Sequence, residues 1–531
     1  MDVAPAYPIE KTYGAFLHRE LSVSWLLLAT LLGGRHRLDP ALIDSGFHYL
    51  DLGCGHGLNL LFNAAAHPQA SFYGVDLNPT HIAAASARAE ALGLGNVHFA
   101  LADLTTFAEG LPSTGPCRGW PESYDIVVAH GLASWVGPEV RQALIAAAGC
   151  LLRPGGIFYC SYNTYPGWLS RSTLQMLSVE EALRAGGSTS LAGIRKAAET
   201  LFRCTGTEDN AWPLGQELPG LRVLVERLQP MPESYLVGEY QSAHQPLYVG
   251  PMHRLCAAHG LSHIGSATLP EMFPAILDPE RRALVMEAGD APMREVLLDL
   301  AINQTFRRDL FARGVCPPPP PWRRQALAEL QLHSCAGAED DRDVFDTGLG
   351  GLGVDPSFVR TLKRTLADGP QSLGWLMDEA SLELEDGLMR LSVLVGAAVV
   401  GVSLSGPDRP EASGLSIAAF NQQCLDQITA GEEIGALLSP VLLQPVSITL
   451  LEAFFLQVAD ADLSSDDRAQ LVWMGITMAG GNVKDPEGRP IEDPDQALRQ
   501  LREFGESFAA GRLPVLRRLG IGTPGGTSPA A

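Results

Sequence analysis

The chain has 531 residues, 46% hydrophobic and 18% charged, with a formal net charge of −22 at pH 7. Because this length exceeds what one hydrophobic core supports, several domains are expected. The acidic balance argues against broad adhesion to nucleic acid or to anionic membranes.

The first third of the chain alternates strand-like and helix-like runs. Residues 10–34 read as an apolar helix that stops at two glycines. The predicted strands that follow are 47–52, 71–75, 97–101, 125–129 and 156–161. Strands separated by helices predict right-handed crossovers and a mainly parallel sheet covered on both faces. The expected fold is therefore α/β, a doubly wound Rossmann-like domain over residues 1–172.

A second, mostly helical domain is predicted over residues 173–316, with helix continuing through 306–310. Five consecutive prolines begin at Pro317, and such a run favours stiff polyproline II, so residues 317–325 are expected to form a linker.

The last region, residues 326–520, reads as an α+β domain for which a winged-helix-like arrangement is a candidate, with strand-like residues around 387–391. Residues 521–531 have nothing to bury and are expected to form a disordered tail.

A glycine-rich turn follows the first predicted strand. Gly53, Gly55 and Gly57 let the backbone turn sharply and approach a ligand where a Cβ would collide. Their G-x-G-x-G spacing differs from the dinucleotide fingerprint G-x-G-x-x-G, and Asp51 lies on the strand just before them. Asp51 suits a cationic or donor-rich ligand.

Acidic residues also end the next two predicted strands. Asp76 is placed to accept hydrogen bonds from both hydroxyls of a ribose. Asp103 could accept from an adenine amine, with Leu104 beside the ring. Each acid could instead cap a helix, but three acids at one sheet edge favour a nucleoside-bearing cofactor.

Residues 51–57, with Asp76 and Asp103, resemble motif I and the later acidic positions of class I S-adenosylmethionine-dependent methyltransferases. A narrower resemblance is to bacterial methyltransferases that carry a methyltransferase regulatory domain, a group that includes lysine methyltransferases acting on outer-membrane proteins. The segments that carry it are 124–131, 134–136, 152–156, 161–168, 233–236, 239–240, 260–261 and 299–314.

The resemblance implies S-adenosylmethionine as the cofactor. The residues expected to bind it are Asp51, Gly53, Cys54, Gly55, Gly57, Asp76, Leu77, Asp103, Leu104 and His130. His130 could touch the methionine moiety or be structural, and Tyr7 and Tyr13 could fold over the cofactor.

Methyl transfer is an in-line displacement that needs alignment of donor and acceptor and exclusion of water, so no nucleophilic side chain is required. Tyr162 and Asn163 offer oxygens just past the fifth predicted strand, and Trp135, Tyr165 and Trp168 could wall a cavity that favours cations. The alternative is that these rings pack the loop against the second domain.

The expected reaction is methylation of a protein side chain, that of lysine. The alternatives are a small-molecule acceptor, such as a sugar or natural product, and a cofactor-binding scaffold without turnover. Neither the oligomeric state nor the acceptor follows from the sequence.

Nine cysteines without a C-x-x-C pair favour reduced thiols and a cytoplasmic location. The sequence shows no zinc-binding spacing, so no metal is expected. It also shows no targeting segment and no membrane span.

Overall fold

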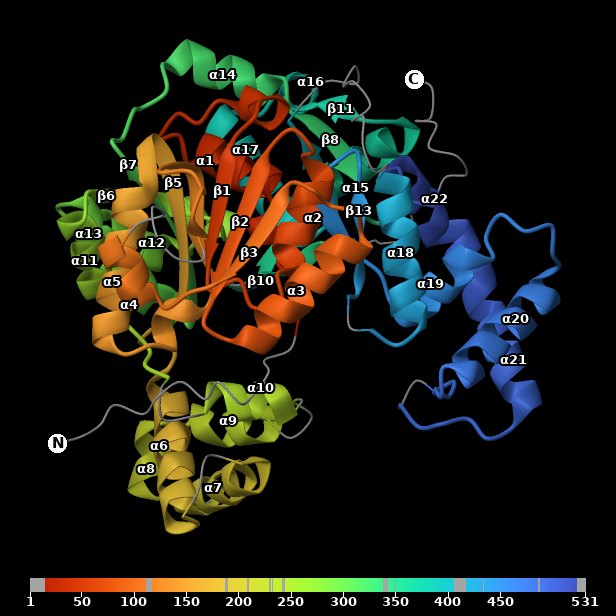
Figure 1. Cartoon of the computed structure of the whole chain (residues 1–531), viewed down its shortest axis with the longest axis horizontal. Coiled ribbons are helices and arrows are strands. Elements are labelled where there is room, and N and C mark those ends of the chain that lie inside the picture. The colour runs from red at the N-terminus through yellow and green to blue at the C-terminus, as the bar shows by residue number, and fades with distance from the viewer. Residues whose placement is uncertain are drawn as a thin grey trace.

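A computed structural model describes residues 15–522, apart from 111–116, 187–189, 208–209, 229–230, 232, 241–243, 338–341, 348, 405–416, 433 and 486–487. Its largest sheet contains β1 (His48–Leu52), β2 (Ser71–Asp76), β3 (Val97–Leu101), β4 (Tyr124–Ala129), β5 (Leu152–Asn163), β6 (Leu261–Ser266) and β7 (Phe306–Arg313). The strand order is β3-β2-β1-β4-β5-β7-β6 (Figure 1). Strands β1 to β5 run parallel, which confirms the predicted doubly wound α/β arrangement.

Strand β7 corrects the prediction of helix through 306–310. It runs antiparallel to both β5 and β6 and extends the sheet beyond the predicted strands. Leu310, Phe311 and Ala312 are fully buried in it, as in a strand covered on both faces. Arg307 and Asp309, whose charges disguise the strand in the sequence, are buried because they pair with each other.

Helices cover both faces of this sheet (Figure 1). They are α1 (Val23–Gly33), α2 (Leu58–Ala66), α3 (Pro79–Ala91), α4 (Leu104–Gly110) and α5 (Pro138–Leu151). Helix α1 is apolar all round and almost entirely buried. It therefore lies inside the molecule rather than on its surface.

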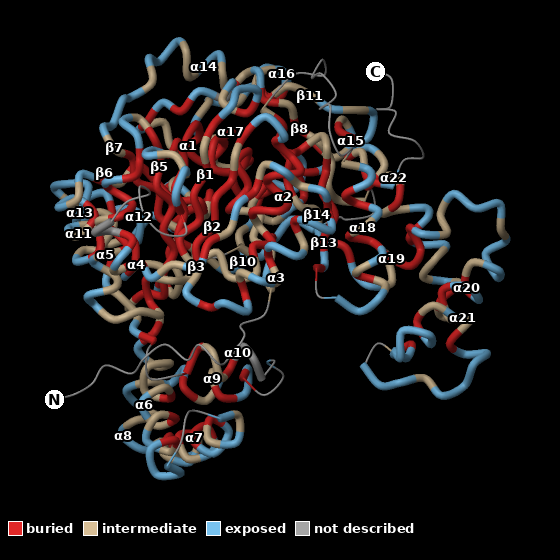
Figure 2. Tube along the Cα trace, viewed as in Figure 1, coloured by how far each residue is buried: buried red, intermediate tan, exposed pale blue. Residues whose placement is uncertain are grey.

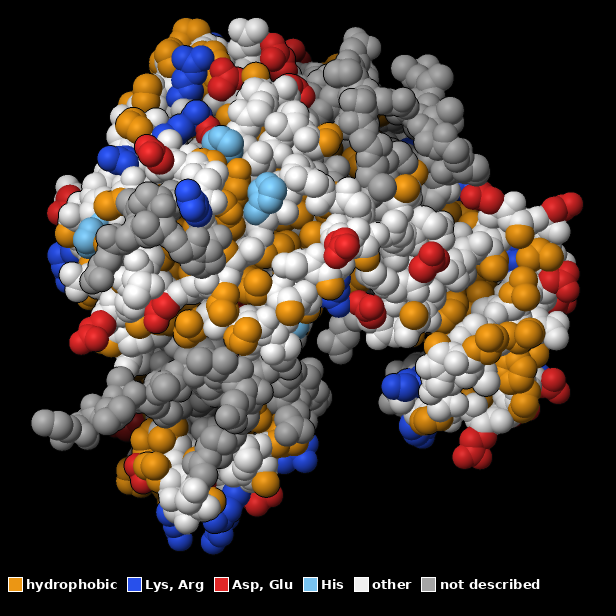
Figure 3. All heavy atoms as spheres, viewed as in Figure 1, with side chains coloured by type: hydrophobic (Ala, Val, Ile, Leu, Met, Phe, Trp, Pro, Cys, Tyr) orange, Lys and Arg blue, Asp and Glu red, His pale blue; other side chains and the backbone are white. Residues whose placement is uncertain are grey.

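A helical lobe follows β5 and projects from the main body (Figure 1). It comprises α6 (Leu169–Arg184), α7 (Leu191–Cys204), α8 (Pro213–Glu217), α9 (Gly220–Leu228) and α10 (Glu233–Glu239). Its own core includes Trp168, Leu201 and Tyr240. Lys and Arg side chains gather at its far end (Figure 3). The exposed basic residues of α6 and α7 include Arg184, Arg195, Lys196 and Arg203.

The chain then returns to the sheet through α11 (Val249–Ala258), α12 (Pro279–Met286) and α13 (Ala291–Ile302), which accompany β6 and β7. The last two of the five prolines open the next helix, α14 (Pro320–Ala328). Proline suits the first helical turn because the N–H that it lacks would have no intrahelical partner there.

Beyond α14 the chain combines helices with small sheets. The strands are β8 (Gln331–Ser334), β9 (Val344–Thr347), β10 (Gly350–Gly353), β11 (Gln371–Ser372), β12 (Val400–Ser403), β13 (Ala436–Ser439) and β14 (Gln444–Ser447). The helices are α15 (Pro356–Asp368), α16 (Leu373–Glu379), α17 (Leu384–Gly396), α18 (Ile417–Thr429), α19 (Leu450–Gln457), α20 (Ser465–Met478), α21 (Pro494–Ser507) and α22 (Leu513–Arg518).

The prediction of strand at 387–391 is wrong, because these residues lie inside α17 and Leu388 and Leu391 face the core at helical spacing. Ile521, at the start of the predicted tail, is fully buried. Residues 523–531 lie outside the described part of the chain.

The hydrophobic core is continuous between the first and last regions. One buried cluster contains residues of α1 and α2 together with residues of α17, α18 and β12. The rings of Phe62 and Phe420 meet edge to face, with centroids 5.0 Å apart. Figure 2 shows the buried residues concentrated where these elements meet the sheet. Among the described residues, every helix is too short or too polar to cross a bilayer.

Candidate functional site

The glycine-rich turn connects β1 to α2. Gly53, Gly55 and Gly57 all have positive φ, at 87°, 53° and 70°. The backbone N–H groups of Gly53 and Cys54 both donate to the carbonyl oxygen of Val75, at 2.8 and 3.0 Å. A Cβ on Gly57 would lie 2.5 Å from the ring of Phe99, whereas the space beside Gly55 is open. The turn is thus fixed on one side and approachable on the other.

Asp51, near the end of β1, is a buried acid without a donor for one of its oxygens. Its Oδ1 has no hydrogen-bond partner among the described residues. Burial, and then the charge of nearby Asp76, raises the pKa of the Asp51 carboxyl to about 8. A buried, unpartnered carboxylate oxygen is costly in isolation and suits a cationic or donor-bearing ligand.

Asp76, at the end of β2, holds the glycine turn. Its Oδ2 accepts from the N–H of Gly55 at 2.9 Å, and its Oδ1 accepts from the N–H of Asn78 at 2.8 Å. Burial alone would raise the pKa of Asp76, but hydrogen bonds from His81, Asn78 and Gly55 together lower it. The carboxylate is therefore ionised and committed to shaping the turn.

Asp103 caps a helix, which is the alternative role that the sequence allows for it. Its Oδ1 accepts from the N–H of Thr105 at 2.9 Å and from the hydroxyl of Thr105 at 2.7 Å, at the start of α4. Asp103 is exposed, Leu104 is buried and Leu77 is 41% exposed.

His130 follows β4 and joins a group of rings. It stacks on His18 with centroids 3.9 Å apart. Its Nδ1 lies 2.9 Å from the hydroxyl of Tyr159 and 3.2 Å from Oγ of Ser161, which also accepts from the N–H of Gly131. Burial drives the pKa of His130 well below 6.5, so the ring is neutral at pH 7. No spacing in the sequence singles out His18, whereas Tyr7 and Tyr13 lie outside the described residues.

Asn163, the last residue of β5, lies at the centre of a second polar group. Its amide lies 3.2 Å from Oε2 of Glu239 and 2.7 Å from Nε2 of His244. The ring of His244 lies 4.7 Å from that of Trp135 and 4.4 Å from that of Trp168. These five residues form what we call the acceptor cluster.

Glu239 and His244 are the members of the acceptor cluster that no pattern in the sequence marks as site residues. Burial raises the pKa of Glu239 to about 7, against the opposing effects of Arg171 and Asn163. Burial, and then the charge of Arg171, lowers the pKa of His244 to about 3, so this ring is neutral. The cluster therefore combines an acid that titrates near neutrality with uncharged aromatic walls.

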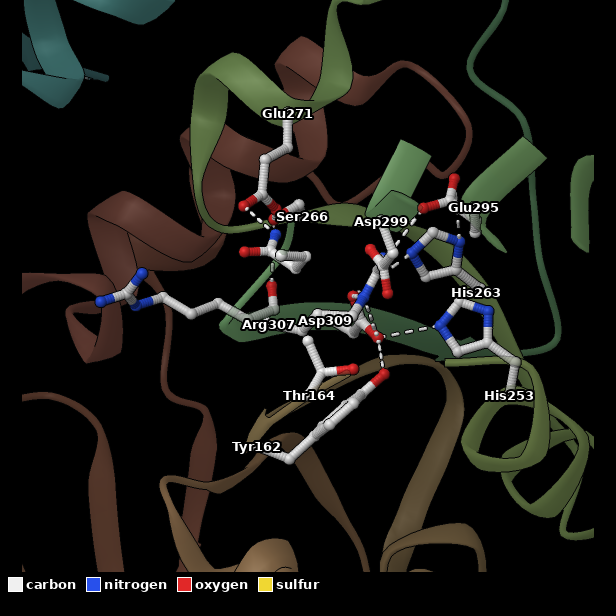
Figure 4. A network of polar contacts seen from close by, with 12 residues as sticks. Tyr162, Thr164, His253, His263, Ser266, Glu271, Glu295, Asp299, Arg307 and Asp309 are labelled. Carbon is white, nitrogen blue, oxygen red and sulfur yellow. Dashed lines mark hydrogen bonds and ion pairs between the residues drawn. The ribbon is translucent and has the colours of Figure 1, made fainter. Parts of the chain in front are cut away.

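Tyr162 does not join the acceptor cluster. Successive side chains of a strand point to opposite faces, and the hydroxyl of Tyr162 donates to Oδ2 of Asp309 at 2.5 Å on the other side of β5. Tyr162 is fully buried there (Figure 4). Tyr165 instead stacks on Tyr248, with ring centroids 4.7 Å apart.

Asp309 belongs to a buried ionic network (Figure 4). Nε of Arg307 donates to both of its oxygens, at 2.9 and 3.1 Å, and Arg307 also pairs with Glu295 and Asp299. The potential ligand atoms of His253, His263 and Asp309 lie within 4.8 Å of one another, as in a metal site. In this arrangement, however, Arg307 already supplies the positive charge that Asp309 requires.

The sequence matches two known domain families. Residues 50–158 match the family described as a methyltransferase domain, and residues 232–313 match a predicted methyltransferase regulatory domain. An uncharacterized protein of Synechocystis sp. is 28% identical over 524 residues, covering 97% of this chain and 99% of that protein. A trans-aconitate 2-methyltransferase of Methylobacterium radiotolerans is 33% identical over 108 residues, covering 20% of this chain and 35% of that enzyme.

The fold is similar to that of PKMT2 from Rickettsia typhi in complex with AdoHcy. The TM-score is 0.65 at 18% sequence identity, and the match covers 94% of this chain and 99% of that chain. The likeness extends across nearly the whole fold, including the elements beyond α14.

Proposed function

The chain is an S-adenosylmethionine-dependent methyltransferase with a methyltransferase regulatory domain, and we propose that it methylates the side-chain amine of lysine in a protein. The observation that carries this proposal is the acceptor cluster, in which Asn163 lies between the buried carboxyl of Glu239 and the ring of His244, and that ring lies near two tryptophan rings.

The residues around the glycine turn fit the cofactor. The unpartnered oxygen of Asp51 suits the ammonium group in the methionine moiety of the cofactor. The open side of Gly55 permits close approach of the backbone to the cofactor. The cofactor supplies a methyl group on a positively charged sulfur, which keeps the electron pair of the broken C–S bond when an amine nitrogen takes the methyl in line.

The acceptor cluster supplies what a lysine requires. The π face of Trp135, which is partly exposed, favours a cation as it enters. Loss of bulk water disfavours the charged amine, so its pKa falls and the proton is released more readily. Glu239, whose pKa is about 7, accepts that proton when ionised. The neutral nitrogen then has a free lone pair, and Asn163 orients it by hydrogen bonding.

One further observation supports a protein acceptor. The net charge of −22 favours association with basic peptide segments.

The proposal is tested by incubating the full chain with methyl-labelled S-adenosylmethionine and a desalted cell extract supplemented with its small metabolites. We expect label in methyllysine, found by mass spectrometry of digested protein. Glu239→Gln should abolish most of it, whereas Glu199→Gln, an exposed acid of the same lobe, should not. Label only in metabolites would establish a small-molecule acceptor, and label in neither fraction despite cofactor binding would establish a scaffold.

A further inference from the structure

We infer that a separate cavity beside β6 binds a small organic carboxylate with a short apolar chain. The cavity has a volume of about 380 Å³ and lies between the end of α1, β6, α12 and α13. This volume is within the range of sites for small molecules. Its walls include none of the residues assigned above to the cofactor or the acceptor cluster.

Three arginines from separate elements line the cavity. Arg35 follows α1, Arg282 belongs to α12 and Arg294 belongs to α13. Among the described residues, none of the three side chains has an ion-pair or hydrogen-bond partner. Nε of Arg294 is buried and still lacks a hydrogen-bond partner. By contrast, neighbouring Arg281 pairs with Asp278. The three arginines thus offer planar donor groups that match a carboxylate.

The acids in the same wall are already satisfied. Glu271 accepts from Oγ of Ser266 at 2.7 Å and from Nε2 of Gln304 at 2.6 Å. Glu295 pairs with Arg307 at 2.7 Å. The uncompensated charge that faces the cavity is therefore positive.

The remaining wall favours an aliphatic chain over a second charged group. Its apolar members include Ile264, Met272, Pro274, Val285, Met286 and Leu298. Burial of each methylene of the ligand against such side chains favours binding. Inorganic phosphate would leave this surface uncovered, so a carboxylate with an apolar chain is the better match.

The cavity is also connected to β5 by polar contacts. Glu295 and Arg307 line the cavity. Arg307 donates a hydrogen bond to Asp309, and Asp309 also accepts a hydrogen bond from the hydroxyl of Tyr162 (Figure 4). Tyr162 directly precedes Asn163. The series of polar contacts that starts at the cavity therefore ends at Tyr162, on the face of β5 opposite the side chain of Asn163.

The test is isothermal titration of the full chain with hexanoate, with inorganic phosphate and hexylamine as comparison ligands. We expect hexanoate to bind and the other two to bind at least tenfold more weakly. Arg282→Ala and Arg294→Ala should each weaken hexanoate binding about tenfold or more, since each removes charged hydrogen bonds.

Arg281→Ala is the matched control and should leave hexanoate binding unchanged, while circular dichroism verifies that each variant is folded. Failure of hexanoate to bind, or equal binding by the folded arginine variants, would overturn the site. Equal binding of phosphate would overturn the assignment of its ligand.

Discussion

The side-chain amide of Asn163 donates to the carboxylate of Glu239 at 3.2 Å, although 76 positions separate the two residues in the chain. Asn163 ends a strand of the catalytic sheet, whereas Glu239 ends the last helix of the projecting lobe. Glu239 and His244 both lie within the segment that matches the methyltransferase regulatory domain. That domain therefore contributes side chains to the proposed acceptor site as well as a surface around it.

The pH dependence of methyl transfer should report the ionisation of Glu239. Its pKa is raised to about 7, so the carboxylate that accepts a proton becomes populated as pH rises through 7. We expect kcat/KM for a lysine peptide to rise over this interval in the native chain. Glu239→Gln should lower kcat/KM about 100-fold and flatten the limb near pH 7, as measured by initial rates.

Glu199→Gln serves as the control for Glu239→Gln and should retain both the rate and the pH profile. If kcat/KM of a folded Glu239→Gln variant still rose with pH near 7 as in the native chain, that ionisation would belong to another group.

Asp51→Asn should have opposite effects on stability and on cofactor binding. The carboxyl has a pKa of about 8 in the folded chain, against 3.8 ordinarily, so it costs stability progressively as pH rises from about 4 to 8. The neutral amide removes that cost, and Tm without cofactor should exceed that of the native chain most clearly at pH 8. Cofactor binding should weaken about tenfold or more in a titration, because a charged partner is lost.

Asp76→Ala and Asp103→Ala separate two roles that acids at strand ends can have. Asp76 shapes the glycine turn through Gly55, and its loss should weaken cofactor binding by about 1.5 to 3 kcal/mol. Asp103 caps α4, so its loss should cost about 1 kcal/mol of stability. Calorimetric titration and urea unfolding distinguish the two, and equal affinities of both variants for the cofactor would contradict the distinction.

The features that follow from the sequence are those set by neighbouring residues. The five parallel strands are apolar runs, and positive φ at Gly53, Gly55 and Gly57 is a local requirement. Strand β7 was missed because Arg307 and Asp309 look solvent-exposed until their mutual pairing is known. That pairing stabilises buried charges that no local pattern reveals.

Only part of the acceptor cluster follows from the sequence, because local patterns reveal strand ends but not long-range packing. Asn163 and Trp135 lie near strand ends, where ligands of α/β sheets bind, so their position alone draws attention. Glu239 and His244 reach them only through the packing of a lobe whose position relative to the sheet is set by long-range contacts. Tyr162 was expected beside Asn163, but the alternation of side chains along β5 sends it to the opposite face.

Removal of the hydroxyl of Tyr162 probes the buried ionic network. Tyr162→Phe leaves Asp309 without one of its donors and should lower the free energy of unfolding by about 1 to 3 kcal/mol. Arg307→Met should cost more, about 3 to 5 kcal/mol, because three carboxyl groups, two of them buried, lose their cation. Urea unfolding followed by circular dichroism measures both, and a smaller loss for Arg307→Met than for Tyr162→Phe would contradict this assignment.

The contact between Phe62 of α2 and Phe420 of α18 tests whether the first and last regions unfold together. Both rings are buried and meet edge to face at 5.0 Å. Each single change to alanine should cost about 3 to 5 kcal/mol. The double variant should lose about 0.5 to 1.5 kcal/mol less than the two single losses combined, because the ring contact is lost only once. Met478→Ala, at a side chain 86% exposed, should have a free energy of unfolding within about 0.5 kcal/mol of that of the native chain.

We expect one unfolding transition that shifts as a whole in the Phe62 and Phe420 variants, since the buried cluster is shared. Two separate transitions, one sensitive to each substitution, would show instead that the regions unfold independently.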